Sequence, residues 1–190
     1  MPTPPRTSLD EIVRAGRGIL DAQGPDALTM ARVASAVGVR APSLYKRVRD
    51  RDALVRLIAE DVVDDLGTTL AAAATTDDAR ADLRAIAVAF RAWAHRHPGG
   101  FGLLFSPIPD AWRLEAEEGS AAIAPMFRAV TVLAEPDRVL EAARTVVAWA
   151  SGFVSMELAG AFRLGGDVER AFTFGVDRIS EAIEGRPSAE

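Results

Sequence analysis

The sequence contains no cysteine and only two histidines in 190 residues. Without cysteine the chain can form no disulfide bond and has no thiolate for catalysis or for holding a metal ion. The histidines, His95 and His97, are two residues apart and would not share a helix face. The sequence also lacks the Glu-x-x-His, G-x-S-x-G and G-x-x-x-x-G-K motifs. We therefore predict that the protein is not an enzyme and uses no cofactor and no metal.

Long apolar runs are absent as well. The first residues, "MPTPPRTS", lack the apolar stretch of a signal peptide. The longest nearly apolar segment, Val146 to Phe162, is short for a membrane span and carries Glu157. We predict a buried helix there, no membrane partner and, given the missing cysteines, a cytoplasmic protein.

Lysine and tyrosine each occur once, side by side, as Tyr45 and Lys46. Charge is divided unevenly along the chain around them. Residues 1–56 hold ten basic and six acidic residues, a balance of +4, whereas residues 57–190 hold twelve basic and 21 acidic, a balance of −9, and the two sum to −5. A basic first segment before an acidic remainder indicates a nucleic-acid-binding head on a body with another task.

Apolar residues recur three or four positions apart, and no useful alternating strand pattern is present, which predicts an all-α protein of about nine helices. The S-x-x-E capping box at Ser8 begins the first helix, which should stop near Gly24. Thr29 caps a short second helix that Gly38 ends in the left-handed conformation. Pro42 fits the first turn of a third helix, and Asp50 caps a fourth, connecting helix that covers residues 50–74.

The remaining chain is also predicted to be helical. Helices are expected over residues 79–96, 135–162 and from Val168 to about Ile183, with a broken helical region before residue 134. The Pro- and Gly-rich stretch 97–110 should be irregular with one short helical piece, and the tail after Gly185 should be loose.

Residues 29–48 form a short helix, a tight turn and a second short helix, the pattern of the helix-turn-helix motif. In that motif the second helix enters the major groove of DNA, where base edges are distinguishable. The base-reading candidates at its start are Arg40, Ala41, Pro42 and Ser43. The phosphate-binding candidates, chosen for reach and chemistry, are Thr29, Tyr45, Lys46, Arg47 and Arg51.

The segment "LTMARVASAVGVRAPSLYKRVRDRDALVRLI", residues 28–58, resembles the DNA-binding domain of the TetR family of transcriptional regulators. The shared features are a Thr that opens the second helix, "AxxxGV", a small residue before "LY", and a basic residue before the next apolar pair. Many members have Phe at the position of Val48 and Lys at that of Arg51. The resemblance implies that Thr29, Tyr45, Lys46 and Arg51 bind phosphates and that Arg40 to Ser43 face bases.

The same resemblance implies a C-terminal body that binds a small ligand and dimerises. All three tryptophans and all eight phenylalanines lie after residue 89, which is compatible with an apolar ligand pocket and equally with a core. The pocket candidates are Trp93, Phe101, Phe105, Trp112, Met126, Phe127, Trp149, Phe153 and Met156.

Small residues on the last two helices would permit close approach of a second copy, although a buried helix within one chain explains them too. The dimer-interface candidates are Ala143, Ala150, Gly152, Ala159, Gly160 and Gly175.

Together these predictions describe a regulator, with a DNA-binding domain in residues 1–50 and a ligand-binding and dimerisation domain in residues 51–190. We expect a homodimeric repressor that binds a palindromic double-stranded operator and is released by a small apolar effector. The alternative is an all-helical small-molecule carrier or interaction protein in which the helix-turn-helix is merely structural.

Overall fold

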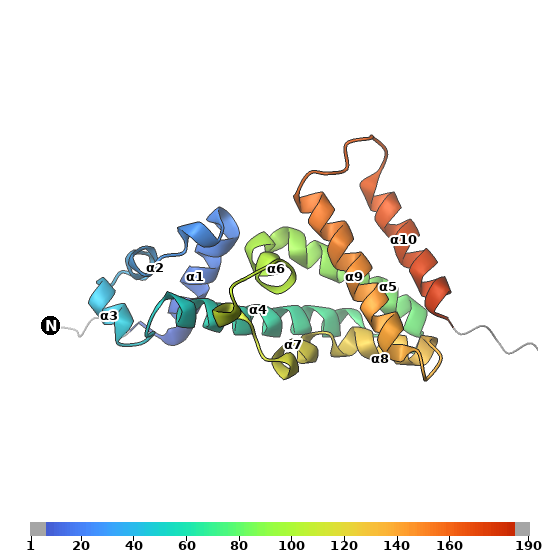
Figure 1. The fold of residues 1–190 in the computed structure, drawn as a ribbon, viewed down its shortest axis with the longest axis horizontal. Helices are drawn as coiled ribbons and strands as arrows, with labels where there is room; N and C mark the ends of the chain where they lie inside the picture. The colour runs from blue at the N-terminus through green and yellow to red at the C-terminus, as the bar shows by residue number, and fades with distance from the viewer. Residues whose placement is uncertain (1–6, 185–190) are drawn as a thin grey trace, which may run out of the picture. The chain divides into compact units, whose positions relative to one another are not determined.

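The computed structural model describes residues 7–184, except for the side chains of residues 116–118, and its regular secondary structure there is entirely helical (Figure 1). The all-α prediction is confirmed, while the predicted loose tail after Gly185 lies outside the described residues. The α-helices are α1 (Leu9–Gln23), α2 (Met30–Ala36), α3 (Ala41–Tyr45), α4 (Arg51–Ala73), α5 (Ala79–Arg96), α6 (Pro98–Phe105), α7 (Ala116–Ala122), α8 (Ala124–Leu133), α9 (Val139–Leu158) and α10 (Val168–Ile183). Two 3-10 helices, η1 (Pro25–Ala27) and η2 (Asp110–Trp112), complete the set.

The chain divides into two compact units. Within the described range, the first unit holds residues 7–64 and 97–119, and the second holds residues 65–96 and 120–184. This division does not follow chain order, because α6 and the segment after it belong to the same unit as the N-terminal helices.

The helix start signals read from the sequence are confirmed. The Glu11 amide donates to Ser8 Oγ at 3.1 Å, and the Ser8 amide donates to Glu11 Oε2 at 2.9 Å. Thr29 Oγ1 accepts from the Arg32 amide at 3.3 Å, and Asp50 Oδ1 accepts from the Ala53 amide at 2.8 Å. Each of the Ser8, Thr29 and Asp50 oxygens accepts a hydrogen bond from an amide that has no backbone partner in the first helical turn.

The long helix predicted over residues 135–162 is shorter at both ends. Residues 135–138 form a turn in which the Arg138 amide donates to the Glu135 carbonyl at 2.8 Å, so α9 begins at Val139. At the other end Gly160 has φ of +63°, which turns the chain out of the helix after Leu158. A glycine favours this conformation because it has no Cβ to clash.

In the first unit, the C-terminal part of α1 contacts the beginning of α6. Asp21 Oδ1 accepts the Gly100 amide at 3.0 Å, and the other carboxylate oxygen lies 3.2 Å from His97 Nδ1. A Cβ at Gly99 would lie 2.5 Å from the carbonyl oxygen of Leu20. Only glycine permits this approach, so the sequence "HPGG" is a packing element rather than a loop.

In the second unit, α5 contacts α8, α9 and α10. The rings of Trp149, Phe153 and Phe172 stack or pack edge-on, with centroids 5.2 to 5.7 Å apart. A Cβ at Gly175 would lie 2.2 Å from the Trp149 ring. α9 and α10 lie side by side and are joined by an exposed loop, residues 159–167 (Figure 1).

Among the described residues, no helix is both long and apolar enough to cross a membrane. The segment from Val146 onward, predicted as a buried helix, forms most of α9, where Val146, Ala150 and Val154 are buried. The opposite face of α9, which includes Arg144, Ala148 and Gly152, is exposed in the single chain.

Candidate nucleic-acid interface and ligand site

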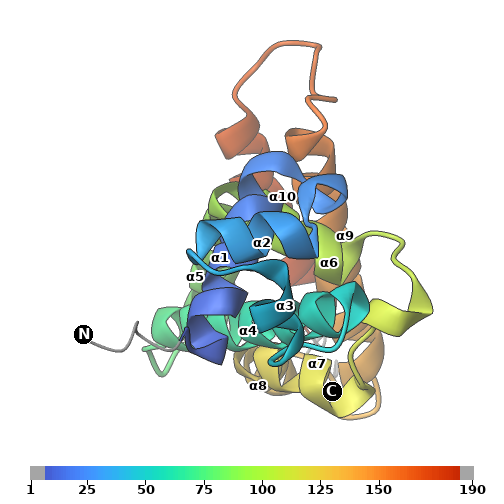
Figure 2. The same ribbon diagram turned by 90° about the vertical axis from the view of Figure 1, so that its left-hand side faces the viewer.

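The α2–α3 region has the geometry of a helix-turn-helix. α2 and α3 contact each other, and the turn between them is closed by the Val39 amide, which donates to the Ala34 carbonyl at 2.9 Å. Gly38 makes the turn with φ of +71°. Figure 2 looks onto these two helices. The predicted motif is therefore present, with the second helix starting at Ala41.

The burial pattern of α3 leaves one face free. Leu44 and Val48 are buried, at 0% and 2% exposed, and they anchor the helix to the first unit. The base-reading candidates Arg40, Pro42 and Ser43 are exposed, and Ala41 is half-buried. Apolar anchors on one side and polar side chains on the other are what a helix inserted into a groove requires.

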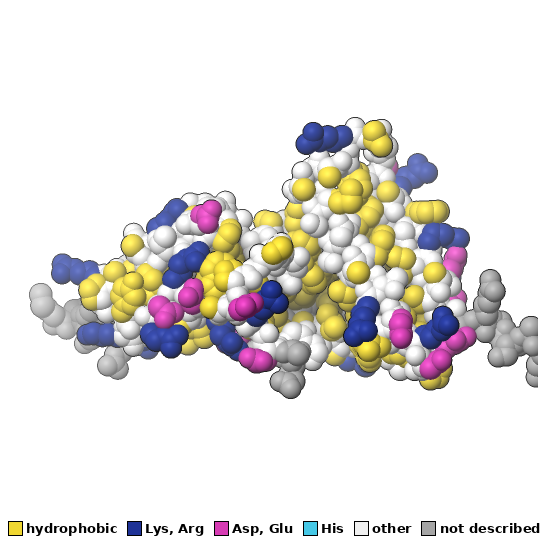
Figure 3. Space-filling model, in the orientation of Figure 1, with side chains coloured by type: hydrophobic (Ala, Val, Ile, Leu, Met, Phe, Trp, Pro, Cys, Tyr) yellow, Lys and Arg dark blue, Asp and Glu magenta, His cyan; other side chains and the backbone are white. Residues whose placement is uncertain are grey.

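The stretch of chain that includes α3 carries several exposed positive charges. Between Ala27 and Arg49 the chain contains no acidic residue. Exposed cations in this stretch belong to Arg32, Arg40, Lys46, Arg47 and Arg49, and dark blue side chains stand out on this part of the surface (Figure 3). Asp50 pairs with Arg49 at 2.7 Å, so the cations of Arg32, Arg40, Lys46 and Arg47 are the ones in this stretch without a neighbouring acidic residue in the sequence, and they suit a polyanionic partner.

The phosphate-binding candidates Thr29, Tyr45, Lys46 and Arg47 are all exposed. Tyr45 is 52% exposed and follows directly on the anchoring Leu44. The Thr29 oxygen accepts the Arg32 amide, so its hydroxyl hydrogen remains able to donate. Thr29 caps the start of α2, and Tyr45, Lys46 and Arg47 lie at the C-terminal end of α3.

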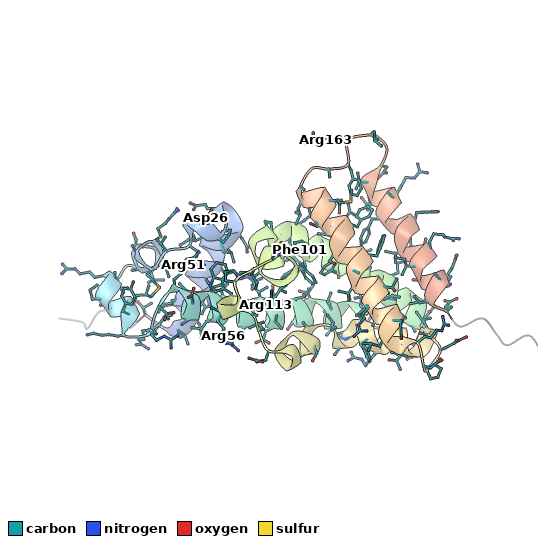
Figure 4. The ribbon with its side chains drawn as sticks, in the orientation of Figure 1. Asp26, Arg51, Arg56, Phe101, Arg113 and Arg163 are labelled. Atoms are coloured by element: carbon teal, nitrogen blue, oxygen red, sulfur yellow. The ribbon has the colours of Figure 1, made fainter. Side chains whose placement is uncertain are left out.

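Arg51 does not share this arrangement. Its Nε donates to the Leu28 carbonyl at 2.7 Å, and Nη2 donates to the Pro25 carbonyl at 2.6 Å. The guanidinium also lies over the Trp112 ring, 4.8 Å from its centroid. Figure 4 labels Arg51 at the start of α4. The phosphate role predicted for Arg51 is not supported by these contacts, because its planar face and two of its donor edges are used within the chain.

Close to α3, Asp50 is held in its ionised form. The Ala53 amide and then the Arg49 guanidinium, 2.7 Å away, lower the pKa of Asp50 below its usual value. Asp50 therefore keeps its capping role for α4 at neutral pH.

The predicted pocket residues do not form one group. Phe101, Phe105 and Trp112 belong to the first unit. The other candidates, which belong to the second unit, are Trp93, Met126, Phe127, Trp149, Phe153 and Met156. Trp149 and Phe153 pack in the aromatic core, and Phe127 and Met156 are exposed. Large apolar side chains distributed over several helices fill cores more often than cavities, and much of this set does so here.

Trp112 does line a hollow in the first unit. The hollow has a volume of about 340 Å³ and is open to solvent. Its walls come from α4, α6 and the segment after α6: Ala59, Val63, Leu103, Leu104, Ser106, Ile108, Trp112, Arg113, Leu114, Glu115 and Gly119. Most of these residues are aliphatic, and a search for aromatic side chains misses them. Their signal in the sequence is a cluster of apolar residues in a stretch with irregular periodicity.

The predicted dimer residues fall into three groups. Ala143 and Ala150 are buried within the chain, and Gly175 lies under Trp149, so packing inside one chain explains these three and they are not available to a partner. Gly160 ends α9. Gly152 and Ala159 are exposed, as are several large apolar side chains near them on the same two helices: Leu140, Met156, Leu158 and Phe174.

The second unit also contains an ion pair between α5 and α9, in which the Glu157 side chain is 7% exposed and that of Arg91 is 22% exposed. Arg91 donates from Nε and Nη2 to the two oxygens of Glu157, at 2.8 and 2.7 Å. His95 Nε2 lies 3.3 Å from Glu157 Oε2. Burial on its own would raise the pKa of Glu157, but the hydrogen bonds from Arg91 and His95 outweigh it, and the pKa lies below its usual value. Glu157 is therefore ionised at neutral pH.

Two family models match the chain. Residues 7–58 match the bacterial regulatory proteins of the tetR family, and residues 83–179 match the Tetracyclin repressor-like, C-terminal domain. An HTH-type transcriptional regulator of Mycobacterium tuberculosis, Rv0681, is 30% identical over 191 residues, covering 96% of this chain and 84% of that protein.

Solved structures share the fold. A protein of unknown function from Rhodococcus sp. RHA1 superposes with a TM-score of 0.77 at 24% identity, covering 94% of this chain and 97% of that one. TetR from Acinetobacter baumannii AYE superposes with a TM-score of 0.68 at 19% identity, covering 93% and 96%. The chain therefore belongs to the TetR family and is a ligand-responsive, DNA-binding transcriptional regulator.

Proposed function

We propose that this regulator is a repressor that binds a palindromic operator as a homodimer and leaves it when a small, mostly apolar effector binds. The observation that carries the proposal is the burial pattern of α3, in which Leu44 and Val48 are anchored while Arg40, Ser43 and Lys46 are exposed. Two such helices related by a two-fold axis would read two half-sites of a palindrome.

In this proposal residues 1–50 act as the DNA-binding domain, and residues 51–190 bind the effector and the second copy. Bases are read by Arg40, Ala41, Pro42 and Ser43 at the start of α3. The arginine fork matches O6 and N7 of guanine, and the two small apolar side chains fit beside a thymine methyl group. Phosphates are bound by Thr29, Tyr45, Lys46 and Arg47, which fix the register of the protein on the duplex.

Arg40→Ala and Lys46→Ala test this division of roles. An operator is first selected from a randomised duplex library with the wild-type protein. Arg40→Ala should cost about 1–3 kcal/mol on that operator and relax the preference at one base pair per half-site. Lys46→Ala should weaken binding to all duplexes alike. Equal effects of both variants across a panel of operator mutants would refute the assignment.

Salt dependence separates the regulator from a carrier with a structural helix-turn-helix. A DNA reader loses affinity with a log–log slope of about −0.9 for each phosphate that it neutralises. Because Lys46 is the only lysine, amine-selective labelling beyond the N-terminus reports on this residue alone. Operator DNA should protect Lys46 from the reagent, and unchanged labelling would favour the carrier.

The hollow lined by Trp112 is the proposed effector site. Six of its eleven lining residues are aliphatic, and Ser106, Arg113 and Glu115 provide polar groups, as small-molecule sites commonly do. A TetR variant from Acinetobacter baumannii AYE has been solved in complex with minocycline, which supports small-molecule binding on this fold.

The half-buried Leu114 offers a test of this site. Leu114→Trp should fill the hollow and abolish the thermal stabilisation that a screened compound gives the wild type. Leu164→Trp, at a fully exposed position of the second unit, is the control and should respond like the wild type. A compound that stabilises the Leu114→Trp variant equally binds elsewhere.

The proposed dimer surface lies on α9 and α10. Phe174 is 66% exposed on α10, and yellow hydrophobic patches lie over both helices in Figure 3. Phe174→Asp should convert the dimer to a monomer in sedimentation velocity, because a charge would face the partner. Val88→Asp, at an exposed apolar position on α5, is the matched control. A Phe174→Asp protein that stays dimeric would exclude this surface.

A further inference from the structure

The contacts of Arg51 point to a role that neither its position in the motif nor its charge predicts. A cation at the start of the helix after a helix-turn-helix is well placed for a phosphate, and the resemblance implied that use. We propose instead that Arg51 is a positioning residue: it holds the segment that leads into α2, and Trp112 holds Arg51, so that the segment after α6 controls the DNA-reading helices.

The first link runs from Arg51 to the backbone before α2. The guanidinium donates to the Pro25 and Leu28 carbonyls at 2.6 and 2.7 Å. The Leu28 amide also donates to the Pro25 carbonyl, at 3.2 Å, so Arg51 clamps both ends of the η1 turn. Leu28 is fully buried, and the next residue is Thr29, the cap of α2 and a proposed phosphate ligand. Arg51 thus sets the direction in which the chain enters α2.

The clamp depends on the planar fork of arginine. Two donors on one rigid plane reach two carbonyl oxygens three residues apart, and hydrogen bonds from a charged donor are stronger than neutral ones. A lysine ammonium is a compact charge that can approach one of these oxygens but has no face to stack. The position therefore distinguishes arginine from lysine, whereas a simple phosphate contact would accept either.

The second link runs from Trp112 to the start of α4. The indole ring lies under the Arg51 guanidinium, 4.8 Å from centroid to Cζ, and its Nε1 donates to Asp52 Oδ1 at 2.8 Å. Two consecutive residues of α4 thus hold the face and the edge of one ring. Trp112 is 9% exposed, and a stacked cation away from bulk water gains more than an exposed one.

The third link connects Trp112 to the hollow. Trp112 lies on η2 and lines the hollow of about 340 Å³, and it also lines a second hollow of about 440 Å³ beside Leu20 and Pro25. Leu103 and Ile108 border both hollows. A molecule that shifts the indole would therefore disturb the Arg51 clamp through direct contact. This step rests on the proposed function, since it assumes that the effector binds there.

The series of contacts from the hollow to α2 therefore has four steps: Trp112, Arg51, the carbonyl groups of Pro25 and Leu28, and Thr29. All four belong to the first unit. Figure 4 labels three residues of this neighbourhood, Arg51 at the start of α4, Asp26 on η1 and Arg113 after η2. A ligand can change DNA affinity only by binding the two arrangements of such a series of contacts with different strength.

The first test compares Arg51→Lys and Arg51→Met on the operator selected by the wild type. If Arg51 positions α2, both variants lose DNA affinity about tenfold or more, and the log–log salt slope stays that of the wild type. If Arg51 binds a phosphate, lysine restores wild-type affinity and methionine lowers the magnitude of the slope by about 0.9 for each protomer. The second result would overturn the proposal.

The second test asks whether Trp112 acts through Arg51. Trp112→Leu should weaken DNA binding, and the double variant Arg51→Met/Trp112→Leu should bind no more weakly than Arg51→Met alone. Fully additive losses would mean that the two residues act separately. Trp93→Phe removes a Trp–Asp hydrogen bond of the same length, to Asp65 in the second unit, and should leave the salt slope and the Arg51 effect unchanged.

A measurement without DNA guards against variants that fold poorly. In a spectrum of ¹⁵N-labelled indoles, Arg51→Lys should shift the Trp112 resonance and leave that of Trp93 in place. If the Trp112 resonance does not move, the stacked contact is absent and the proposal fails. If the wild-type protein selects no duplex, the proposed function is refuted. If Arg51→Lys binds the operator as tightly as the wild type does, only this inference is refuted.

Discussion

The two units solve the same packing problems with different chemistry. Each contains an indole that donates to an aspartate at 2.8 Å, Trp112 to Asp52 in the first unit and Trp93 to Asp65 in the second. Each also has a glycine at a contact too close for any other residue, Gly99 and Gly175. In the first unit the close contact meets backbone, and in the second it meets the ring of Trp149.

The two units also differ in how exposed their charged side chains are. The first unit leaves the cations around α3 exposed and uses one arginine to clamp carbonyl oxygens. The second unit takes a carboxylate inside, where Glu157 is 7% exposed and bidentate with Arg91. Charge joins helices in both units, since Arg17 of α1 pairs with Asp61 of α4 at 2.8 Å in the first, but only the first unit also leaves a group of cations exposed around α3.

The largest effect is expected from breaking the buried pair. Arg91→Met leaves the Glu157 carboxylate without its main partner in a buried site, and the free energy of unfolding should fall by about 3 kcal/mol. Arg84→Met removes an exposed pair with Asp177 between α5 and α10 and should cost less than about 1 kcal/mol. Urea unfolding measures both. Equal losses would show that burial of the pair does not matter.

A smaller effect is expected at the two close glycines. Gly99→Ala should lower the free energy of unfolding by about 2 kcal/mol, since the new Cβ meets the Leu20 carbonyl, which cannot rotate away. Gly175→Ala should cost less, because the Trp149 ring can turn. Thermal melts measure the difference.

Two other glycines are the controls for that comparison. Gly18 in α1 and Gly102 in α6 have no atom within 4 Å of an added Cβ. Alanine there should stabilise the protein by up to about 1 kcal/mol, through helix propensity alone. A loss at these positions would mean that the close contacts at Gly99 and Gly175 do not explain their sensitivity.

A fall in pH should remove the contribution that ionised Glu157 makes to the stability of the second unit. The folded-state pKa of Glu157 lies below its usual value, so its contribution to stability is complete above the unfolded-state pKa, about 4.3, and is lost as pH falls through the folded-state pKa. The stability difference between wild type and Glu157→Gln should therefore shrink from pH 6 to pH 3. Denaturant unfolding across this range measures it, and a constant difference would contradict the assignment.

The smallest effect is expected at the cap of α2. Thr29→Ala removes the acceptor for the Arg32 amide and should cost about 1 kcal/mol, while Thr29→Ser should cost little. Unfolding reports this structural role. DNA binding of the serine variant should stay near that of the wild type, because serine keeps both the cap and the hydroxyl donor.

Much of the fold was readable from local signals. The capping residues Ser8, Thr29 and Asp50 and the turn at Gly38 were predicted from residue type and spacing, because each acts on backbone groups within a few positions. α5 was predicted with the bounds that it has, Ala79–Arg96, since its apolar period is regular. α9 was predicted too long because its composition stays apolar past the point where Gly160 turns the chain.

The candidate site was predictable in part, for the same reason. The helix-turn-helix and its exposed cations follow from a contiguous stretch, residues 29–48. The pocket candidates were chosen by aromatic type, and that type does not distinguish a core ring such as Trp149 from one that borders a hollow. Only Trp112 of that set lines the hollow of about 340 Å³, among mostly aliphatic neighbours.

By itself the sequence determined the helices, the reading motif and the division between a basic head and an acidic body, because these depend on neighbours along the chain. The tertiary structure decided that Arg51 reaches the carbonyls of Pro25 and Leu28 and stacks on Trp112, residues 26, 23 and 61 positions away. No local pattern specifies such contacts, because only folding brings these groups within hydrogen-bonding and stacking distance of the guanidinium.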